Sequence, residues 1–397
     1  MNEYITVRYL TEGKDLSKKA EGIAVGMTVG SWTELPAARK EMLAPYLGRV
    51  EGVTVQEECS GIQRGIISIQ YPVGNITPDI PALLTTVFGK LSMDGKIKLM
   101  DIDFPPSLLS QFPGPKFGIE GVRSLLGVTE RPLLMSIFKS CLGLPLHELE
   151  EQFAAQLEGG VDLVKDDEIF FVDDKAPLEK RLQSYNRIRE NAGRPVLYAA
   201  NLTGPVHQLI DRAKYAIENG ANCLLLNILP YGFDILHRLA ADPDITVPLM
   251  AHPALAGAFS SAAEYGIASP LLLGKLMRIA GADLVLFPSP YGSVALERNE
   301  ALAIADNVRA ENGVHRPSFP VPSAGIHPAL VPQLYEDFGT DAIINAGGGV
   351  HGHPGGAADG ARAFRAAIDA VTSGRTLADA ANESQPLAAA LKKWGGA

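Results

Sequence analysis

Eight short apolar runs, each followed by an amphipathic segment, constrain this chain more than any other feature of its sequence. The runs begin roughly 23 to 37 residues apart, which is the spacing of βα units joined by short loops. They cover residues 133–138, 161–164, 196–200, 223–228, 247–251, 284–287, 319–322 and 342–344. Parallel strands that are buried on both faces have unbroken apolar sequences of this kind. The pattern therefore predicts parallel strands that alternate with helices.

Eight such units over about 240 residues fit a (β/α)₈ TIM barrel. A doubly wound open sheet has the same alternation and is the alternative, but the number of units favours the barrel. The segment 146–157 is typical of the predicted helices. Its apolar residues at 146, 149, 153 and 157 follow the helical period, and the pair Gly159-Gly160 supplies a left-handed stop.

The first 120 residues follow a different pattern. Strands are predicted over 4–9, 50–57, 65–71 and 97–103, and helices over 16–27 and 80–91. This β-α-β-β-α-β order predicts a ferredoxin-like α+β domain over residues 1–120. The segment 111–115 contains two prolines around a glycine and is expected to form a linker. We expect the barrel over residues 121–376 and a helical tail over 377–397, so the fold class is α/β.

Charge and cysteine content exclude several classes of protein. Acidic residues outnumber basic ones by 45 to 35, which disfavours binding to nucleic acid or an anionic membrane. The three cysteines are too few for a disulfide framework and fit a reducing cytosol. The uncharged segment 245–263 contains two prolines and cannot cross a bilayer as a helix. The N-terminus lacks a signal-peptide pattern. We therefore expect a soluble, cytoplasmic protein.

Barrels carry their active sites on the rim formed by the C-terminal ends of the strands. Polar residues or glycines follow every predicted strand of this chain. They are Lys139; Lys165, Asp166, Asp167 and Glu168; Asn201; Asn227; His252; Ser289; Ser323 and Gly325; and Gly347, Gly348 and Gly349. Exposed loops are polar in any protein, but groups from eight separate segments would here converge on one rim.

The run Lys165-Asp166-Asp167-Glu168 is the most informative of these segments. On a strand, residues 165 and 167 face the same way, and residue 168 follows as the chain leaves the sheet. Neighbouring carboxylates repel one another unless a cation neutralises them. A hard cation with oxygen ligands, above all Mg²⁺, suits such a cluster. A solvated acidic turn is the alternative.

The loops after the seventh and eighth predicted strands have the composition of a phosphate site. They contain Ser323-Ala324-Gly325 and Gly347-Gly348-Gly349, and glycines let an anion approach backbone N–H groups. His351 and His353 are expected to make hydrogen bonds within a loop rather than to bind zinc. His252 is either a core histidine or part of the site. A metal at one edge and a phosphate at the other indicate a phosphorylated, oxygen-rich small molecule.

Several motifs resemble the large subunit of ribulose-bisphosphate carboxylase (RuBisCO) and its RuBisCO-like relatives. The segment 159–168, Gly-Gly-Val-Asp-Leu-Val-Lys-Asp-Asp-Glu, carries the resemblance, which extends over nearly the whole chain from 18–24 to 360–370. The segments 135–139, 287–296 and 345–354 are similar to the RuBisCO-like enolases of methionine salvage. These enolases convert 2,3-diketo-5-methylthiopentyl-1-phosphate to 2-hydroxy-3-keto-5-methylthiopentenyl-1-phosphate, so the resemblance implies an isomerase.

The resemblance also implies roles for individual residues. Lys165, carbamylated by CO₂, would bind one Mg²⁺ per subunit together with Asp167 and Glu168. Lys90 matches the proposed base of the enolase branch, and Lys139 matches a lysine that handles protons in the carboxylase. Substrate contacts would come from Lys139, Lys165, Asp166, Asp167, Glu168, His252, Ser323, Gly325, Gly347 and Gly348. The family further implies a homodimer in which the N-terminal domain of one chain covers the barrel mouth of its partner.

One departure from the carboxylase pattern separates two chemistries. The carboxylase needs a lysine in the loop after the sixth strand, and the corresponding segment 288–296 of this chain contains none. Enolisation survives that change, whereas carboxylation does not. Two other functions stay open: a RuBisCO-like isomerase that acts on another phosphorylated ketose, and a non-catalytic barrel that serves as a binding module. The intact Lys165, Asp167, Glu168 and glycine loops disfavour the binding module.

Overall fold

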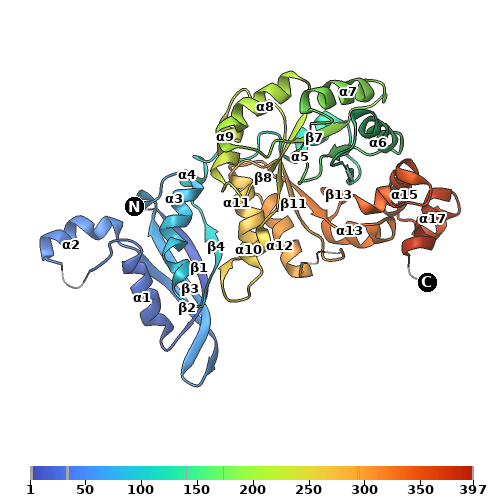
Figure 1. Ribbon diagram of the computed structural model, residues 1–397. Helices are drawn as coiled ribbons and strands as arrows, with labels where there is room; N and C mark the ends of the chain where they lie inside the picture. Colours follow the sequence, from blue (N-terminus) through green and yellow to red (C-terminus); the bar gives the residue numbers. More distant parts are fainter. Residues whose placement is uncertain are drawn as a thin grey trace.

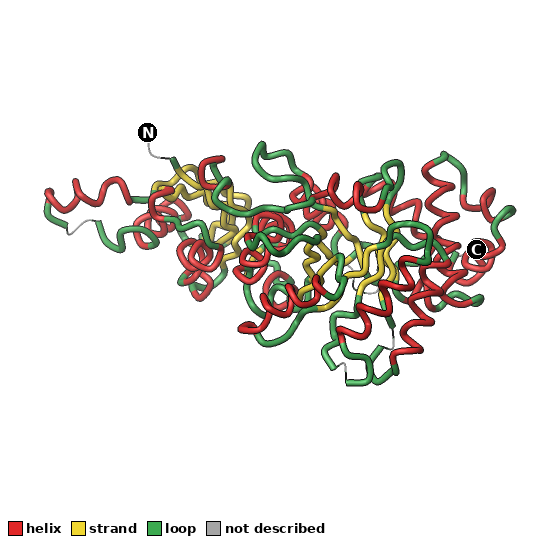
Figure 2. Tube along the Cα trace, turned by 90° about the horizontal axis from the view of Figure 1, so that it is seen from above, coloured by secondary structure: helices red, strands yellow, loops and turns green. Residues whose placement is uncertain are grey.

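The structure is a computed structural model that describes residues 3–32, 35–139, 141–172, 174–292, 294 and 296–395. An N-terminal sheet with its helices lies at one end of an elongated molecule, a barrel occupies the middle, and the C-terminal helices lie at the other end (Figures 1 and 2). None of the helices in the described ranges combines the length and the apolar character that a membrane span requires.

The N-terminal sheet has the ferredoxin-like arrangement that the sequence predicts. Its strands β1 (Tyr4–Gly13), β2 (Arg49–Cys59), β3 (Ile62–Pro72) and β4 (Ile97–Asp103) lie in the order β4-β1-β3-β2 and pair antiparallel. Helix α1 (Leu16–Gly26) follows β1, and α3 (Ile80–Leu84) follows β3. The hydroxyls of Tyr9 and Tyr71 lie 2.8 Å apart inside this domain and satisfy each other.

Two of the predicted helices are interrupted. The helix predicted over 80–91 continues from α3 as a π-helical turn, η3 (Thr85–Gly89), and a 3₁₀ turn, η4 (Leu91–Met93). The hydroxyl of Thr85 donates to the Pro81 carbonyl at 2.7 Å and competes with the regular helical pattern. The tail is two helices, α16 (Leu377–Ala381) and α17 (Gln385–Trp394), because Ser384 caps the second one.

The sequence did not predict three further elements. Helix α2 (Ala37–Leu43) and the 3₁₀ turn η1 (Ala44–Tyr46) lie between α1 and β2. The short strand β10 (Gly266–Ile267) belongs by sequence to the barrel, yet it pairs in parallel with β4 at the edge of the N-terminal sheet.

All eight apolar runs are strands of one parallel sheet, which confirms the barrel. The strands are β5 (Leu133–Ile137), β6 (Leu163–Lys165), β7 (Leu197–Asn201), β8 (Cys223–Asn227), β9 (Leu249–His252), β11 (Leu284–Pro288), β12 (Phe319–Ser323) and β13 (Ile343–Ala346). Their hydrogen-bonded order is β12-β11-β9-β8-β7-β6-β5-β13. The last strand thus pairs with the first, and the doubly wound open sheet is excluded.

Strands β12 and β13 are neighbours in the barrel but do not pair through their backbones, and the sequence explains why. The Phe319 N–H donates to the Asp283 carbonyl, and the Ser323 carbonyl accepts from the Ser289 N–H. Both partners flank β11, so the odd-numbered residues of β12 direct their backbone groups toward β11. The alternate residues, Pro320 and Pro322, face β13 and have no N–H to donate. A side-chain hydrogen bond of 2.8 Å from Asn345 Nδ2 to Ser323 Oγ connects the two strands instead.

Helices surround the barrel and close its lower end. The surrounding helices are α6 (Leu146–Glu158), α7 (Leu178–Glu190), α8 (Leu209–Glu218), α9 (Asp234–Ala241), α11 (Leu276–Ile279) with the π-helical turn η6 (Pro270–Lys275), α12 (Arg298–Arg309), α13 (Val331–Phe338) and α15 (Gly356–Thr372). Helix α5 (Gly118–Leu126) packs Ile119, Val122 and Leu126 against the inward-facing strand residues. Short helices α4 (Pro106–Leu109), α10 (Ala256–Ser260) and α14 (Gly348–His351) lie in loops.

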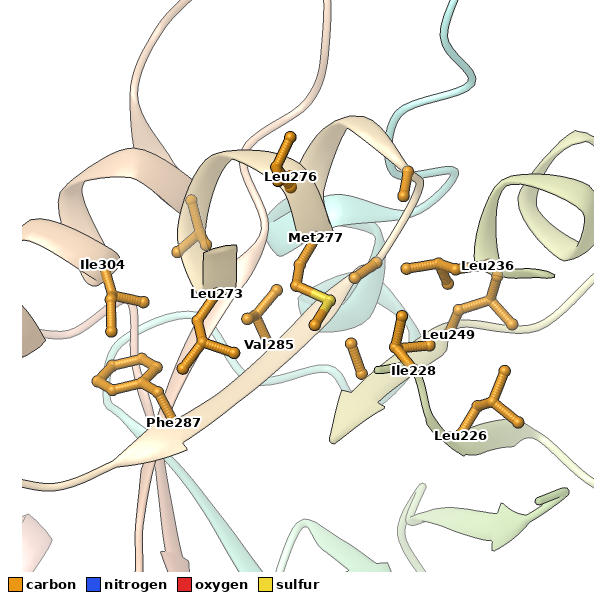
Figure 3. Close-up of a cluster of buried hydrophobic side chains, with 14 of the residues drawn as sticks. Leu226, Ile228, Leu236, Leu249, Leu273, Leu276, Met277, Val285, Phe287 and Ile304 are labelled. Carbon is orange, nitrogen blue, oxygen red and sulfur yellow. The ribbon is translucent and has the colours of Figure 1, made fainter. Parts of the chain in front are cut away.

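Alternation along the strands divides the barrel core into two layers. Residues such as Leu133, Met135, Leu163 and Leu225 point inward and form one cluster with α5. Their neighbours point outward and pack against the helices. Figure 3 shows part of this outer layer, where Phe287 of β11 lies near Leu273 of η6 and Ile304 of α12.

The N-terminal sheet is fastened to the barrel through the loop that follows β9. Lys98 of β4 is buried, and its ammonium donates to the carbonyls of Ser260 at 3.0 Å and Ala262 at 2.6 Å. The β10–β4 pairing lies next to this contact. The expected linker is also packed, because Phe112 is buried and the Gly114 N–H donates to the Ile279 carbonyl.

Candidate functional site

Inward-facing and outward-facing residues alternate along each barrel strand, and this alternation determines which polar side chains face the barrel interior. In six of the eight strands, the last inward-facing position holds a polar side chain at the C-terminal rim. These residues are Lys165, Asn201, Asn227, His252, Ser323 and Asn345. Four of the six are buried and His252 and Ser323 are partly buried, and a buried polar group needs a partner or a ligand.

A cavity of about 400 Å³ lies above these side chains. Lys139, Lys165 and Glu168 line it from the ends of β5 and β6, His252 lines it from β9, and Ser323 and Asn345 line it from β12 and β13. The cavity thus brings together Lys165, at its floor, and four other residues that the sequence predicted for substrate contact: Lys139, Glu168, His252 and Ser323. Asn345, which was not predicted, also lines it.

Two ion pairs hold the charged end of this cavity together. Lys139 Nζ lies 2.8 Å from Asp167 Oδ2, and Lys165 Nζ lies 3.6 Å from Glu168 Oε2. His252 Nε2 approaches the same Glu168 oxygen at 3.6 Å. Asp167 is buried beside the cavity and is reached through Lys139. Two cations thus balance two carboxylates in the unmodified chain.

Burial shifts the protonation of these groups. It lowers the pKa of Lys165, although the carboxylates of Glu168 and Asp167 oppose the shift. Burial would raise the pKa of Glu168, but the attraction to Lys165 and hydrogen bonding outweigh it, and the pKa is lowered. An amine with a lowered pKa has a larger neutral fraction, and only the neutral form is a nucleophile.

His252 is held in one tautomer. Burial, followed by the charge of Lys165, lowers its pKa well below the usual value, so the ring is neutral. Its Nδ1 accepts a hydrogen bond from the Ala254 N–H at 3.2 Å. The proton therefore resides on Nε2, which points to the side of Glu168 and can donate to an oxygen in the cavity.

Asp166 does not belong to the cavity, which corrects the substrate contact predicted for it. Its carboxylate accepts from Arg181 Nη1 at 2.8 and 2.9 Å, from the Tyr198 hydroxyl at 2.6 Å and from the Asn201 N–H at 3.0 Å. It is fully buried between β6, β7 and α7. The reason is the strand alternation, because residue 166 faces outward when 165 and 167 face inward.

Two asparagines that sequence reasoning left without a role support the acidic turn. Asn201 Nδ2 lies 3.2 Å from the carbonyls of both Asp167 and Glu168, and Asn227 Nδ2 donates to the Glu168 carbonyl at 2.9 Å. They orient the backbone from which the two carboxylates project. The only sign of this role in the sequence is that each asparagine ends one of two neighbouring strands, β7 and β8, at an inward-facing position.

The glycine loops lie beside the cavity without lining it. A Cβ on Gly347 would lie 2.8 Å from Lys139 Cε, so this glycine makes room for the lysine. A Cβ on Gly348 would meet no atom within 4 Å, and its residue begins α14. Gly325 has φ +66° and follows Ala324, which lines the cavity.

Lys90 lies outside this cavity within one chain. It is exposed at the end of η3 and lines a separate cavity of about 560 Å³ against α1, together with Lys19, Met27 and Asp94. Lys90 can therefore reach a barrel site only if that site belongs to another subunit.

His351 and His353 make loop hydrogen bonds, as predicted. His351 Nε2 bonds with the Ile137 carbonyl and His353 Nε2 with the Pro386 carbonyl, each at 2.9 Å. Zinc is not needed to explain either side chain.

The donor set fits Mg²⁺ only after a change at Lys165. Among the described residues, no three His, Cys, Asp or Glu side chains gather at one point. Lys165 stands beside Glu168, while Asp167 faces the same interior. A carbamate on Lys165 would replace a cation by an anion and leave three negative charges against Lys139. A divalent cation with oxygen ligands neutralises such a set.

Comparison with known proteins shows the family of this chain. Residues 118–394 match the model of the ribulose bisphosphate carboxylase large chain, catalytic domain. The chain belongs to the RuBisCO large-chain family. It is 53% identical over 400 residues to a 2,3-diketo-5-methylthiopentyl-1-phosphate enolase from Bacillus licheniformis, covering 100% of this chain and 98% of that one. The corresponding Geobacillus kaustophilus enolase is 50% identical over 407 residues, with 100% and 98% covered.

Solved structures give the same family. A RuBisCO-like protein (MtnW) from Alicyclobacillus acidocaldarius superimposes with a TM-score of 0.94 at 52% identity, covering 99% of this chain and 100% of the other. An octameric RuBisCO from Pyrococcus horikoshii has a TM-score of 0.90 at 31% identity, with 99% and 93% covered. The family fold thus includes both the N-terminal sheet and the barrel.

The buried pair of Asp166 and Arg181 generates a stability prediction. Arg181→Ala leaves a buried carboxylate without its cation and should lower the free energy of unfolding by about 3–5 kcal/mol. Arg187→Ala, on the exposed side of the same helix, should change it by no more than about 0.5 kcal/mol. Urea denaturation followed by circular dichroism measures both. Equal effects of the two variants would show that the pair does not stabilise the fold.

Proposed function

We propose that this chain is the methionine-salvage enolase that converts 2,3-diketo-5-methylthiopentyl-1-phosphate to 2-hydroxy-3-keto-5-methylthiopentenyl-1-phosphate. The observation that carries the proposal is identity of 50–53% over the full length with several relatives named for this enolase activity. The site supports it, because a lysine–carboxylate cluster and glycine loops share one rim of the barrel. The reaction is a keto–enol isomerisation.

Lys165 as a carbamate, Asp167 and Glu168 would hold one Mg²⁺. The bound ion would supply positive charge near the substrate oxygens as the enolate develops. His252, neutral with its proton on Nε2, would donate a hydrogen bond to a substrate oxygen. Ser323 and the backbone at Gly325, Gly347 and Gly348 would bind the phosphate. Asp166 would position the acidic turn rather than touch the substrate.

The proton transfers are assigned to two lysines. Lys90 of the partner subunit would remove a proton from C1, the carbon that carries the phosphate ester. The electron pair moves into a C1–C2 double bond, and the C2 oxygen gains a proton. Lys139, held by Asp167 at 2.8 Å, lies on the cavity wall where it can exchange a proton with substrate oxygens. The separation of Lys90 from the barrel cavity of its own chain supports a homodimer with shared sites.

The loop after β11 supports enolisation without carboxylation. Residues 289–297 contain no lysine, and the Tyr291 hydroxyl donates to Asp337 at 2.6 Å. A Cβ on Gly292 would lie 1.7 Å from the Ala324 carbonyl, so the loop packs tightly against its neighbour. The loop therefore lacks the cation that would stabilise a CO₂ adduct.

The first test combines the reaction with the carbamate. Purified protein should convert the diketo phosphate, followed by proton NMR, and preincubation with bicarbonate and Mg²⁺ should raise the rate. Lys165→Ala removes the amine that reacts with CO₂ and should abolish Mg²⁺-dependent turnover. The ¹³C NMR signal of a protein carbamate, formed with labelled bicarbonate, should disappear in the same variant. Full turnover by Lys165→Ala in CO₂-free buffer would contradict the assignment.

The second test concerns the phosphate. Gly348→Val adds a side chain into space that is open in the protein, so folding should be unaffected. If the phosphate approaches this backbone, KM should rise by roughly tenfold or more, since the anion loses its hydrogen bonds. Thermal melting and steady-state kinetics measure the two effects. Gly347→Val is the contrasting variant, because it also displaces Lys139 and should reduce kcat. A kinetically normal Gly348→Val protein would overturn the phosphate assignment.

The third test asks whether Lys90 of one subunit is the base in the active site of its partner. Lys90→Ala should reduce kcat by about 10²- to 10⁴-fold through loss of general base catalysis, whereas Lys18→Ala, an exposed lysine of α1, should not. Lys90→Ala and Lys165→Ala proteins, each inactive alone, should recover activity when subunits exchange. Random exchange makes about half of the dimers mixed, each with one intact site, so recovery should approach about a quarter of wild type. Mixed dimers seen by native mass spectrometry without activity would place both lysines in one chain's site.

A further inference from the structure

The cavity above Lys165 has two chemically different sides. Lys139 and Lys165 follow β5 and β6, whereas β9 and β11 lie across the barrel from them. On that far side most of the lining is apolar, and the polar groups, His252, Ser260, Ser261 and Ser269, are uncharged or neutral. The apolar lining residues are Pro253, Ala254, Leu255, Ala256, Leu273, Phe287, Pro288, Val294 and Leu296. Lys139 and Lys165 are the only lysines, and no arginine is present, among the described lining residues. A second anionic group would therefore find no cation on the apolar side.

Leu255 is the unusual member of this wall. The Ala256 N–H donates to the Pro253 carbonyl at 2.9 Å, which closes a four-residue turn. Leu255 is the third residue of that turn and has φ +71° and ψ 0°, the values of a type II turn that favours glycine or asparagine. A leucine with this backbone is strained, and its side chain remains 57% exposed. More than half of this apolar residue therefore stays in contact with solvent.

The turn is held from both sides. At its start, the Ala254 N–H donates to Nδ1 of His252, the histidine that lines the cavity and directly precedes the turn. At the far end of the same loop, Lys98 of the N-terminal sheet binds the carbonyls of Ser260 and Ala262. The loop is therefore a fixed wall of the cavity, and the position of Leu255 is set jointly by the barrel and the N-terminal sheet.

We propose that Leu255 is a specificity-determining residue that packs against the apolar tail of a monophosphorylated diketone. This inference rests on the proposed function. The phosphate would lie toward the loops after β12 and β13 and the diketone at the lysine–carboxylate cluster, which directs the tail to the apolar side. Leu273 and Phe287, which are buried and lie near each other in Figure 3, also line this part of the cavity. The wall selects an alkyl or thioether tail and rejects a bisphosphate.

The test is a series of 2,3-diketo-1-phosphates with tails of different length. Wild-type kcat/KM should fall about fourfold for each methylene removed, as expected for burial of one CH₂ group. Leu255→Asn keeps a similar size and tolerates positive φ, but it presents an amide to the tail. It should lower kcat/KM for the methylthioethyl substrate about tenfold, mainly through KM, and change that of the shortest analogue by less than twofold. Leu255→Gly removes the strain and should flatten the dependence on tail length in the same way.

Phe259→Asn is the matched control, because Phe259 is exposed on the same loop but does not line the cavity. It should preserve the wild-type dependence on tail length. If both Leu255 variants keep that dependence, or lose activity equally on all substrates while folded, the inference is overturned and the proposed function stands. If wild-type protein converts none of the diketo phosphates, both are overturned.

Discussion

The ion pair between Asp166 and Arg181 is the constraint on which the rest of the site depends. It is fully buried on the outer side of β6, where the Tyr198 hydroxyl and the Asn201 N–H complete the coordination of the carboxylate. A strand cannot fix one residue outward without turning its neighbours inward. The pair therefore directs Lys165 and Asp167 into the barrel, where a lysine with a lowered pKa lies against two carboxylates.

This arrangement gives the lysine that precedes three acidic residues a role in charge balance. In the unmodified chain, Lys165 and Lys139 balance Asp167 and Glu168. A carbamate on Lys165 reverses one charge and creates the need for a divalent cation. Metal binding and CO₂ uptake would thus be coupled through charge balance alone, and neither would be complete without the other.

The sequence predicted the strands well, because every barrel strand is buried on both faces and has an apolar run. It predicted the helix boundaries less well, since the turn at Thr85 depends on a side-chain hydrogen bond and β10 depends on a partner from another domain. For the site, the alternation rule already implied that Asp166 faces outward. The positions of Asn201 and Asn227 at strand ends were visible in the sequence. Their hydrogen-bond partners were not, because their amides bind backbone carbonyls that become neighbours only when β6, β7 and β8 are adjacent.

The two sides of the cavity depend on different parts of the fold. The lysine–carboxylate side follows from strand alternation and the Asp166–Arg181 pair, and a change there would disturb the core. The apolar side is built from loops, where Leu255 occupies a turn position that stability alone would assign to glycine. In the loop after β11, Gly292 lies against Ala324 and the Tyr291 hydroxyl donates to Asp337. On the proposed mechanism, enolisation depends on the lysine–carboxylate side, whereas the choice of substrate depends on the apolar side.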